Sequence, residues 1–467
     1  MKLAKLQITH FRCFESLTIE LQRDVNVFVG INGAGKTSVL DALAMVLYDV
    51  VASNGGGGRR QRSHQAANLR PEDIHIMPGV ADPVAGRKDF VQISAQACDF
   101  YPLSGFPDKT STGAENFIEW TDHIAYKPPA EFSYETSQSA RLATIYDYFS
   151  ALWQELRMTD PKAKVLIPFP VVAYYRADRR LRDMPDLGDI FRLEMDRAGA
   201  YDSALNAGAD YRAMCQWFYL RENQELREKL QARNDPSFEF PDLRAVRQVL
   251  GRSVENVKRV FFKDNPPSLN VEFQDPHGLP QVQALEQLSD GYRNLLAVIL
   301  DFARRLAQAN PTWENPLDAP GILLIDEIEL HLHPRWQQTV IPRLRESFPN
   351  TQLIVATHSP QVLTTVRSRC IQILRDQKLF AAPPATYGAE SKRMLERVMG
   401  ASSRPPEDDN EFARNIRRLF DLINQNQLDQ AQSLLNELEA RAGGEEPALV
   451  EAETIISNRR WEKEVGL

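Results

Sequence analysis

The feature that most constrains this sequence is a glycine-rich loop, GINGAGKT, at Gly30–Thr37. Residues 24–29 before it are apolar enough for a buried strand, and residues 37–50 after it have helical spacing. A glycine loop between a strand and a helix turns backbone N–H groups inward at a helix N-terminus, and this arrangement binds phosphate. The segment, called the glycine loop below, therefore predicts an α/β fold with a phosphate-binding site.

The residue types in the glycine loop match the parts of a bound nucleoside triphosphate. Lys36 is expected to reach the β- and γ-phosphates, and the Thr37 hydroxyl is expected to face Mg²⁺. A chance match is the alternative, and the flanking strand and helix argue against it. The predicted nucleotide-binding residues of this segment are Gly30, Asn32, Gly33, Ala34, Gly35, Lys36, Thr37 and Ser38.

A second apolar segment, GILLI at 321–325, ends in two acids, Asp326 and Glu327. This pattern predicts a buried strand that delivers carboxylates at its carboxyl end, where α/β sheets place their ligands. Asp326 is expected to hold Mg²⁺, and Glu327 is expected to orient and deprotonate the attacking water as a catalytic residue. The alternative is an acidic strand end at the surface, and the preceding glycine loop makes it the weaker interpretation.

Two shorter segments complete the pattern. LSDGYR at 288–293 precedes an apolar helix and offers the Ser289 hydroxyl and the Gly291 N–H at a helix N-terminus, although a plain helix cap is the alternative. THSP at 357–360 follows the apolar segment LIVA, and the His358 imidazole can hydrogen-bond a phosphate oxygen. Such a histidine is usually structural, but its place after the other elements favours a functional role.

Composition narrows the class of protein. A charged fraction of 25% is ordinary for a globular protein. The length of 467 residues predicts roughly two or three structural units. We recognise no apolar run that could cross a membrane and no signal peptide, so we expect a cytoplasmic protein without a membrane partner. The net charge of −8 argues against a generally basic nucleic-acid binder. The cysteines lack the spacing of a zinc site: Cys13, Cys98, Cys215 and Cys370.

The order of the glycine loop, LSDGYR, GILLIDE and THSP resembles that of the ABC ATPase class, in the branch shared by RecF, SMC heads and OLD-type ATPases. FRCF at 11–14 looks like the FRxF element of that branch, and DEIELHLHP resembles its Walker B and D-loop segments. The resemblance implies a P-loop NTPase of the ABC-ATPase head type that binds ATP and Mg²⁺. It also implies roles for individual residues: Arg12 near the nucleotide, Glu327 and His358 in catalysis, and Ser289 and Gly291 as a signature acting in trans.

Periodicity and this resemblance together divide the chain. Alternating apolar residues predict antiparallel strands at 2–9, 88–97 and 116–125, and charged segments such as RENQELREKLQAR predict long exposed helices. The expected fold is α/β, with a mixed sheet, an antiparallel lobe, a helical insertion and a C-terminal helical hairpin. The expected units are the N-terminal part of the head at 1–185, the insertion at 186–262, the C-terminal part of the head at 263–385 and the helical region at 386–467.

Two details of the family pattern are less defined in this sequence. His331 and His333 have the spacing of one strand face and could form a metal pair, but a loop that contacts a second subunit is the favoured interpretation. Gln92, on an expected strand, is the candidate for the Q-loop glutamine.

The resemblance also implies partners. In this class the signature of one head completes the ATP site of another, so we expect a homodimer or higher homo-oligomer joined by ATP. The overall layout, including the tail segment TYGAESKRMLERVMG, resembles the PtuA family of ATPase subunits in Septu-type antiphage systems. Members of that family pair with an HNH nuclease, which implies that this chain regulates a separate nuclease. The tail is then either a dimerisation element or a docking element.

Three alternative functions share parts of this pattern. A RecF-like repair or recombination ATPase would bind DNA directly, through arginines that are otherwise solvated: Arg59, Arg60, Arg62, Arg176, Arg179, Arg180 and Arg182. An OLD-like intrinsic nuclease would need a TOPRIM cluster of carboxylates, and no apolar segment ending in DxD follows His358. An importer ATPase is disfavoured by the FRCF element and the antiparallel insertions.

Overall fold

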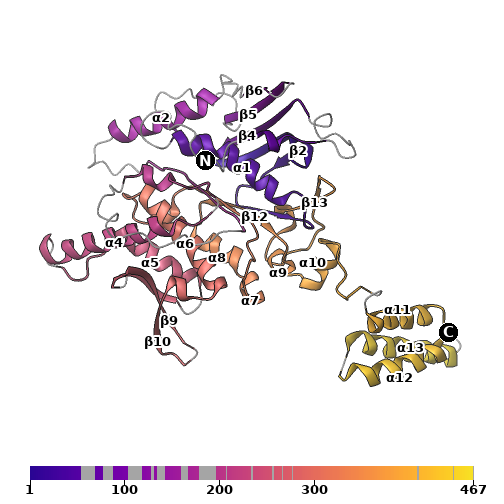
Figure 1. Ribbon diagram of the computed structural model, residues 1–467. Helices are drawn as coiled ribbons and strands as arrows, with labels where there is room; N and C mark the ends of the chain where they lie inside the picture. Colours follow the sequence, from indigo (N-terminus) through magenta and orange to yellow (C-terminus); the bar gives the residue numbers. More distant parts are fainter. Residues whose placement is uncertain are drawn as a thin grey trace. The chain divides into compact units, whose positions relative to one another are not determined.

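A mixed six-stranded sheet carries the segments identified in the sequence (Figure 1). Its strands from β13 to β7 run parallel, and β14 is antiparallel to β13. Every residue of β3, β7, β11 and β12 is buried, as expected for parallel strands covered on both faces. The order is β14 (Lys378–Ala381), β13 (Ile371–Arg375), β3 (Val25–Val29), β12 (Thr351–Thr357), β11 (Gly321–Ile325) and β7 (Val171–Tyr175).

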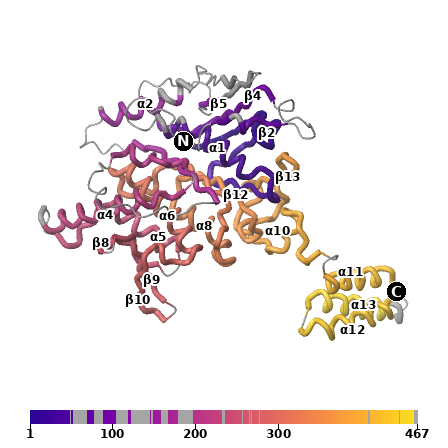
Figure 2. The backbone as a smooth tube through the Cα atoms, in the orientation of Figure 1, coloured from indigo at the N-terminus to yellow at the C-terminus, as the bar shows by residue number. Residues whose placement is uncertain are grey.

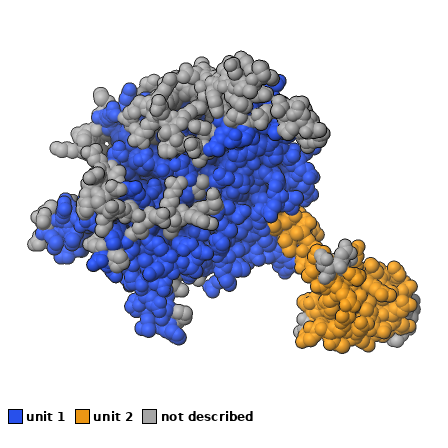
Figure 3. Space-filling view, viewed as in Figure 1, with its two compact units in different colours: residues 1–394 blue, residues 395–467 orange. Residues whose placement is uncertain are grey.

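The computed structural model divides the chain into two compact units, residues 1–394 and 395–467 (Figure 3). It describes residues 1–53, 69–76, 88–103, 118–127, 131–133, 142–158, 167–177, 196–206, 208–232, 235–254, 257–265, 267–275, 277–406, 410–444 and 446–465.

A second sheet, antiparallel throughout, confirms the strands predicted near the N-terminus. Helix α1 (Lys36–Ser53) contacts both sheets, and α2 (Leu142–Met158) packs against α1 and β5. The Trp120 Nε1 atom on β5 donates to the Val46 carbonyl of α1 at 2.8 Å. This lobe is therefore packed directly on the helix that follows the glycine loop. Its order is β2 (Phe14–Glu20), β1 (Lys2–Phe11), β4 (Phe90–Cys98), β5 (Ile118–Lys127) and β6 (Glu131–Ser133).

Helices occupy the described part of the predicted insertion, and a small sheet that begins near its end continues beyond residue 262; Figure 2 traces this part of the backbone from α4 to β10. Helix α4 (Tyr211–Arg227) continues into one π-helical turn, and α5 (Pro241–Ser253) packs against it. An antiparallel sheet follows, in the order β10 (Pro280–Ala284), β9 (Pro267–Gln274) and β8 (Val257–Asp264). The segment after β10 leads to α6 (Asp290–Ala309), which begins inside LSDGYR.

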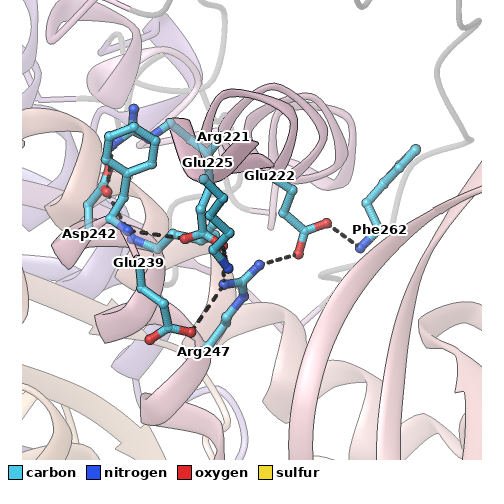
Figure 4. A network of polar contacts seen from close by, with 10 residues as sticks. Arg221, Glu222, Glu225, Glu239, Asp242, Arg247 and Phe262 are labelled. Atoms are coloured by element: carbon cyan, nitrogen blue, oxygen red, sulfur yellow. Dashed lines mark hydrogen bonds and ion pairs between the residues drawn. The ribbon is translucent and has the colours of Figure 1, made fainter. Parts of the chain in front are cut away.

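The prediction that α4 is exposed was wrong for the face that meets α5. Arg247 lies 3.0 Å from Glu225 and 2.9 Å from Glu222, and Arg221 lies 2.7 Å from Asp242 (Figure 4). Glu225 is only 3% exposed. Charged side chains can be buried when each one is paired and hydrogen-bonded. The helical spacing of charges in the sequence does not reveal that pairing, because the partners come from α5.

Short elements connect the strands of the larger unit, and each is one or two turns long. They are η1 (Pro71–Asp73), η2 (Ala198–Tyr201), η3 (Glu228–Ala232), η4 (Leu285–Gln287), η5 (Pro316–Asp318), α7 (Pro334–Gln337), α8 (Val340–Ser347), α9 (Pro360–Leu363) and η6 (Ser368–Cys370). Helix α10 (Ser391–Arg397) spans the boundary between the two units.

The C-terminal unit is a three-helix bundle, where the sequence predicted a two-helix hairpin. Helix α12 (Leu428–Ala442) ends at Gly443, which has a φ of 66°, and α13 (Pro447–Val465) then packs against α11 (Glu411–Asn424) and α12. A hairpin would leave its apolar face open to water, and α13 covers that face. The core consists of Ile416, Leu419, Ile423, Ala431, Leu435, Leu438, Leu449, Ala452 and Ile456.

Two further expectations concern the chain as a whole. Within the described ranges, no helix has both the length and the apolar character required to cross a membrane. Cys13, Cys98, Cys215 and Cys370 are thiols outside any disulfide, and all but Cys13 are buried.

We predict that Leu435→Ala destabilises the C-terminal bundle by about 2–5 kcal/mol, because it opens a cavity at a fully buried position. Native-state hydrogen exchange of amides in residues 411–465 measures the effect as lost protection. Glu439→Ala, at an exposed position of the same helix, is the control and should leave protection unchanged. Equal protection in the Leu435 variant would contradict the bundle core described here.

Candidate nucleotide-binding site

The central sheet brings the predicted site segments to one edge. The glycine loop follows β3, Asp326 follows β11, and His358 follows β12. These strands are adjacent and parallel, in the order β3-β12-β11. The carboxyl ends of parallel strands share one edge of a sheet, so the three segments meet although the chain separates them widely.

Lys36 lies folded over the glycine loop. Its Nζ atom donates to the carbonyls of Gly30, at 2.9 Å, and Ile31, at 3.1 Å. The side chain is buried, and burial lowers the pKa of Lys36 below its ordinary value, an effect that the Asp326 carboxylate partly offsets. Gly33 and Gly35 have φ of 80° and 100°, a backbone region that strains other residues. The loop conformation thus depends on glycine at both positions.

The FRCF element supports the loop from the antiparallel lobe. A Cβ atom at Gly35 would lie 2.4 Å from Phe14 Cζ and 2.8 Å from Cys13 Sγ. Burial raises the pKa of the Cys13 thiol, and a hydrogen bond with Ser38 partly offsets that effect. In the rest of the loop Ala34 is buried, whereas Asn32 is exposed. Phe14 and Cys13 therefore close the space beneath the loop, and only glycine fits against them.

Thr37 and Asp326 are in direct contact. The Thr37 Oγ1 atom donates to Asp326 Oδ2 at 2.8 Å, which joins the start of α1 to the end of β11. Burial raises the pKa of Asp326, and the hydrogen bond from Thr37 opposes this rise. A hydroxyl and a carboxylate are oxygen donors of the kind that Mg²⁺ binds. The two residues therefore fit the magnesium site that the sequence predicts.

Glu329, which the sequence reasoning did not single out, holds the segment that carries His358. Its carboxylate accepts from Thr357 Oγ1 at 2.7 Å and from the backbone N–H of His358. Burial, and next the Lys36 ammonium, lower the pKa of His358 below its ordinary value. Glu327 has a φ of 46°, which turns the chain sharply between β11 and Glu329. The sequence signal for Glu329 was its place as the third acid of DEIE, directly after the two acids that end the strand.

Arg12 contacts α1 through an acid that the sequence reasoning also missed. Its guanidinium lies 2.5 Å from Asp41 Oδ2 and 2.8 Å from Asp73 Oδ1. Burial disfavours the charged form, but the bonds to Asp41 and Asp73 outweigh it and raise the pKa of Arg12. Asp41 lies one helical turn after Thr37 and is 6% exposed. An acid one turn beyond the glycine loop was the signal available.

The LSDGYR segment begins α6 at the surface. Ser289 occupies the N-cap position of α6, is exposed, and makes no side-chain cap hydrogen bond. A Cβ atom at Gly291 would lie 2.4 Å from the His331 carbonyl. Tyr292 and Trp336 pack edge to face with ring centroids 4.1 Å apart. The LSDGYR segment therefore packs closely against residues 331–336, which follow Glu327 in the chain.

The remaining candidates lie elsewhere or outside the described residues. His331 has a φ of 62°, and His333 Nδ1 accepts from the Arg335 backbone N–H at 3.3 Å. Among the described residues no group of three or more His, Cys, Asp or Glu could hold a metal ion. Gln92 on β4 donates to Ser94 Oγ at 3.3 Å.

Of the candidate arginines, Arg176 lies 3.8 Å from Asp41 Oδ2. The others lie outside the described residues: Arg59, Arg60, Arg62, Arg179, Arg180 and Arg182.

Comparison with known proteins adds family information to this geometry. Residues 5–236 match a family model described as "AAA domain", and residues 171–364 match one described as "AAA domain, putative AbiEii toxin, Type IV TA system". The first range contains the glycine loop. The second contains LSDGYR, Asp326 and His358.

Similar proteins occur among bacterial retron and Septu proteins. The "Retron Ec83 probable ATPase" of Escherichia coli is 26% identical over 524 residues, which cover 99% of this chain and 88% of that protein. The Septu protein PtuA of Bacillus mycoides (strain KBAB4) is 46% identical over 76 residues, which cover 16% of this chain and 10% of that protein.

Among solved structures, the SMC head bound to the C-winged helix domain of ScpA has a TM-score of 0.44 and 15% identity, with 82% of this chain and 98% of that chain covered.

The family matches and the full-length similarity to the retron protein agree with the segments that meet at the sheet edge. The chain is therefore identified as a protein with an AAA-family ATPase domain, related to retron ATPases and to the Septu protein PtuA.

Proposed function

We propose that this chain hydrolyses ATP between two copies of its head and thereby regulates a separate HNH-type nuclease in antiphage defence. The observation that carries the ATPase part is the contact between Thr37 and Asp326, 2.8 Å apart, beside Lys36 and Glu327. A bound triphosphate would satisfy the buried Lys36 ammonium, and a magnesium ion held with it would satisfy the Thr37 hydroxyl and the Asp326 carboxylate. The similarity to a retron ATPase and to PtuA supports the part that concerns defence.

In this proposal the glycine loop binds the phosphates. The loop N–H groups and the start of α1 attract negative charge, and Lys36 exchanges its bonds to Gly30 and Ile31 for bonds to the β- and γ-phosphates. Thr37 and Asp326 would hold Mg²⁺, which neutralises charge on the phosphate oxygens when it is bound. Phosphate charge would also favour the ammonium form of Lys36, which burial otherwise opposes.

Hydrolysis is assigned to the residues after β11 and β12. Glu327 orients the attacking water and accepts its proton, as phosphoryl transfer requires positioning more than covalent help. His358 donates a hydrogen bond to the γ-phosphate from its imidazole ring. Glu329 is a positioning residue, because it holds the backbone of His358 and the hydroxyl of Thr357.

The site is proposed to close in trans. Ser289 is exposed at the N-terminus of α6, and its hydroxyl makes no cap bond within its own helix. A helix N-terminus with a serine hydroxyl is suited to a phosphate of another subunit. ATP would join two heads, and loss of the γ-phosphate would loosen them. The homodimer or a higher homo-oligomer is then the active form.

We predict that Gly35→Ala abolishes ATP binding, because the added Cβ collides with Phe14 and deforms the glycine loop. Gly388→Ala is the matched control: Gly388 also has positive φ, of 75°, but lies in open space. Each substitution costs about 1–2 kcal/mol of backbone strain. Equilibrium binding of a fluorescent ATP analogue distinguishes them, and normal affinity in the Gly35 variant would overturn the loop assignment.

We expect Glu327→Gln to bind ATP and accumulate as a nucleotide-bound dimer while kcat falls about 100- to 10,000-fold, as for loss of a general base. Lys36→Ala should bind no nucleotide and remain undimerised by ATP. Phosphate release and light scattering, with and without Mg²⁺, measure both effects. Turnover of the Glu327 variant at the wild-type rate would show that another residue is the base.

For the partner, we predict that the tagged chain, purified from its native host, retains an HNH nuclease in fixed stoichiometry, identified by mass spectrometry. The tag alone serves as the control. The purified chain itself should show no salt-dependent DNA binding. Salt-dependent DNA binding without a retained nuclease would instead favour the RecF-like function, in which heads bind DNA directly.

A further inference from the structure

Two adjacent tyrosines at the end of β7 bind helices on opposite faces of the central sheet. Tyr174 and Tyr175 are 2% and 1% exposed, and successive side chains of a strand point to opposite faces. The Tyr174 hydroxyl donates to Asp41 Oδ1 on α1 at 2.7 Å. The Tyr175 hydroxyl donates to Asp301 Oδ2 on α6 at 2.8 Å. β7 packs against both helices, so one strand end links them.

The α1 side of this link leads to the glycine loop. Asp41 lies one turn after Thr37 and accepts from Arg12 of the FRCF element at 2.5 Å. Burial and the nearby Asp41 carboxylate raise the pKa of Tyr174 well above its ordinary value, so its hydroxyl remains a donor. A hydrogen bond from a buried hydroxyl to a carboxylate is costly to leave unmade. Tyr174 and α1 are therefore expected to shift together.

The α6 side leads to the LSDGYR segment. Asp301 is completely buried, and it lies 2.7 Å from Arg304 Nη2 and 2.9 Å from Arg305 Nε. Burial opposes the charge of Asp301, but Arg305 and Arg304 hold its pKa below the ordinary value. Arg305 also donates to the carbonyls of Ala200 and Asp202 at 2.7 and 2.8 Å. The middle of α6 is thus held to the sheet through Tyr175.

The same strand end positions the predicted magnesium ligand. The Asp326 N–H donates to the Tyr175 carbonyl at 2.8 Å, and Tyr175 lies opposite Ile325 in the parallel register of β7 and β11. A displacement of Asp326 therefore acts on Tyr175, which also holds Asp301. Tyr174 and Tyr175 together thus contact α1, α6 and Asp326.

We propose that Tyr174 and Tyr175 are positioning residues that couple nucleotide at the glycine loop to the placement of α6, and hence of Ser289 at its N-terminus. The coupling rests on the proposed function, because it requires nucleotide at the loop. Removal of one hydroxyl should uncouple α6 without removing any group that contacts the nucleotide.

Hydrogen exchange on the full chain tests this coupling without requiring turnover. A non-hydrolysable ATP analogue is expected to slow exchange in residues 36–53 of α1 and in residues 296–309 of α6. In Tyr175→Phe the protection of α1 should persist and that of α6 should fall about 10-fold, as expected for loss of one hydrogen bond to a charged group. Tyr148→Phe is the control, because Tyr148 is also buried and its hydroxyl bonds to the backbone of Tyr101, away from β7 and α6.

Turnover gives a second readout. Tyr175→Phe should lower kcat and leave the affinity for the analogue unchanged, whereas Tyr174→Phe should weaken analogue binding. The loss of kcat/KM in the double variant should be smaller than the product of the two single losses, since both hydroxyls act through β7. Wild-type protection of α6 in Tyr175→Phe, or losses no larger than those in Tyr148→Phe, would overturn the coupling. Absence of any protection of α1 in the wild type would instead overturn nucleotide binding, and the coupling with it.

Discussion

The hydrogen bond between Thr37 and Asp326 is the contact on which the site depends. It joins residues 289 positions apart, and it forms only when the start of α1 and the end of β11 reach the same sheet edge. The parallel register of β3, β12 and β11 meets that condition, because their carboxyl ends are aligned. The fully buried strands around it leave little room for adjustment: a Cβ atom at Gly30 would lie 2.4 Å from the Leu374 carbonyl. The packed sheet thus determines the positions of Thr37 and Asp326 relative to each other.

The antiparallel lobe supports the same contact from the other side. Phe14 and Cys13 fill the space beneath Gly35, and Arg12 holds α1 through Asp41. The FRCF element therefore has a structural basis here that is independent of any ligand: it clamps the glycine loop and the first turns of the following helix. The expectation that Arg12 lies near the nucleotide remains a prediction, although its anchor, Asp41, is on the helix that begins with Lys36.

Buried charge recurs where elements must keep a defined position. Asp301 is paired with Arg304 and Arg305 on α6, and Arg247 is paired with Glu222 and Glu225 between α4 and α5 (Figure 4). Such pairs add little stability over apolar packing, since desolvation offsets their attraction, but separating them is costly. The Asp301 cluster lies on α6, the helix that begins after Ser289, and that position fits a function in alignment. Tyr175 extends that alignment from α6 to the strand beside Asp326.

The site segments could be predicted because each is contiguous: a glycine loop after an apolar strand, two acids after another, and a histidine after a third. Local spacing determines those elements, and it also predicted the antiparallel strands of the lobe. The residues that sequence reasoning missed, Asp41, Glu329 and the Tyr174–Tyr175 pair, act through partners far away in the chain. The covering helix α13 was missed for a similar reason, since a face to be covered exists only once α11 and α12 have packed. What the sequence alone determined is which segments form the candidate site. What the tertiary structure decided is which side chains meet, because strand order in the sheet, and not order in the chain, places them together.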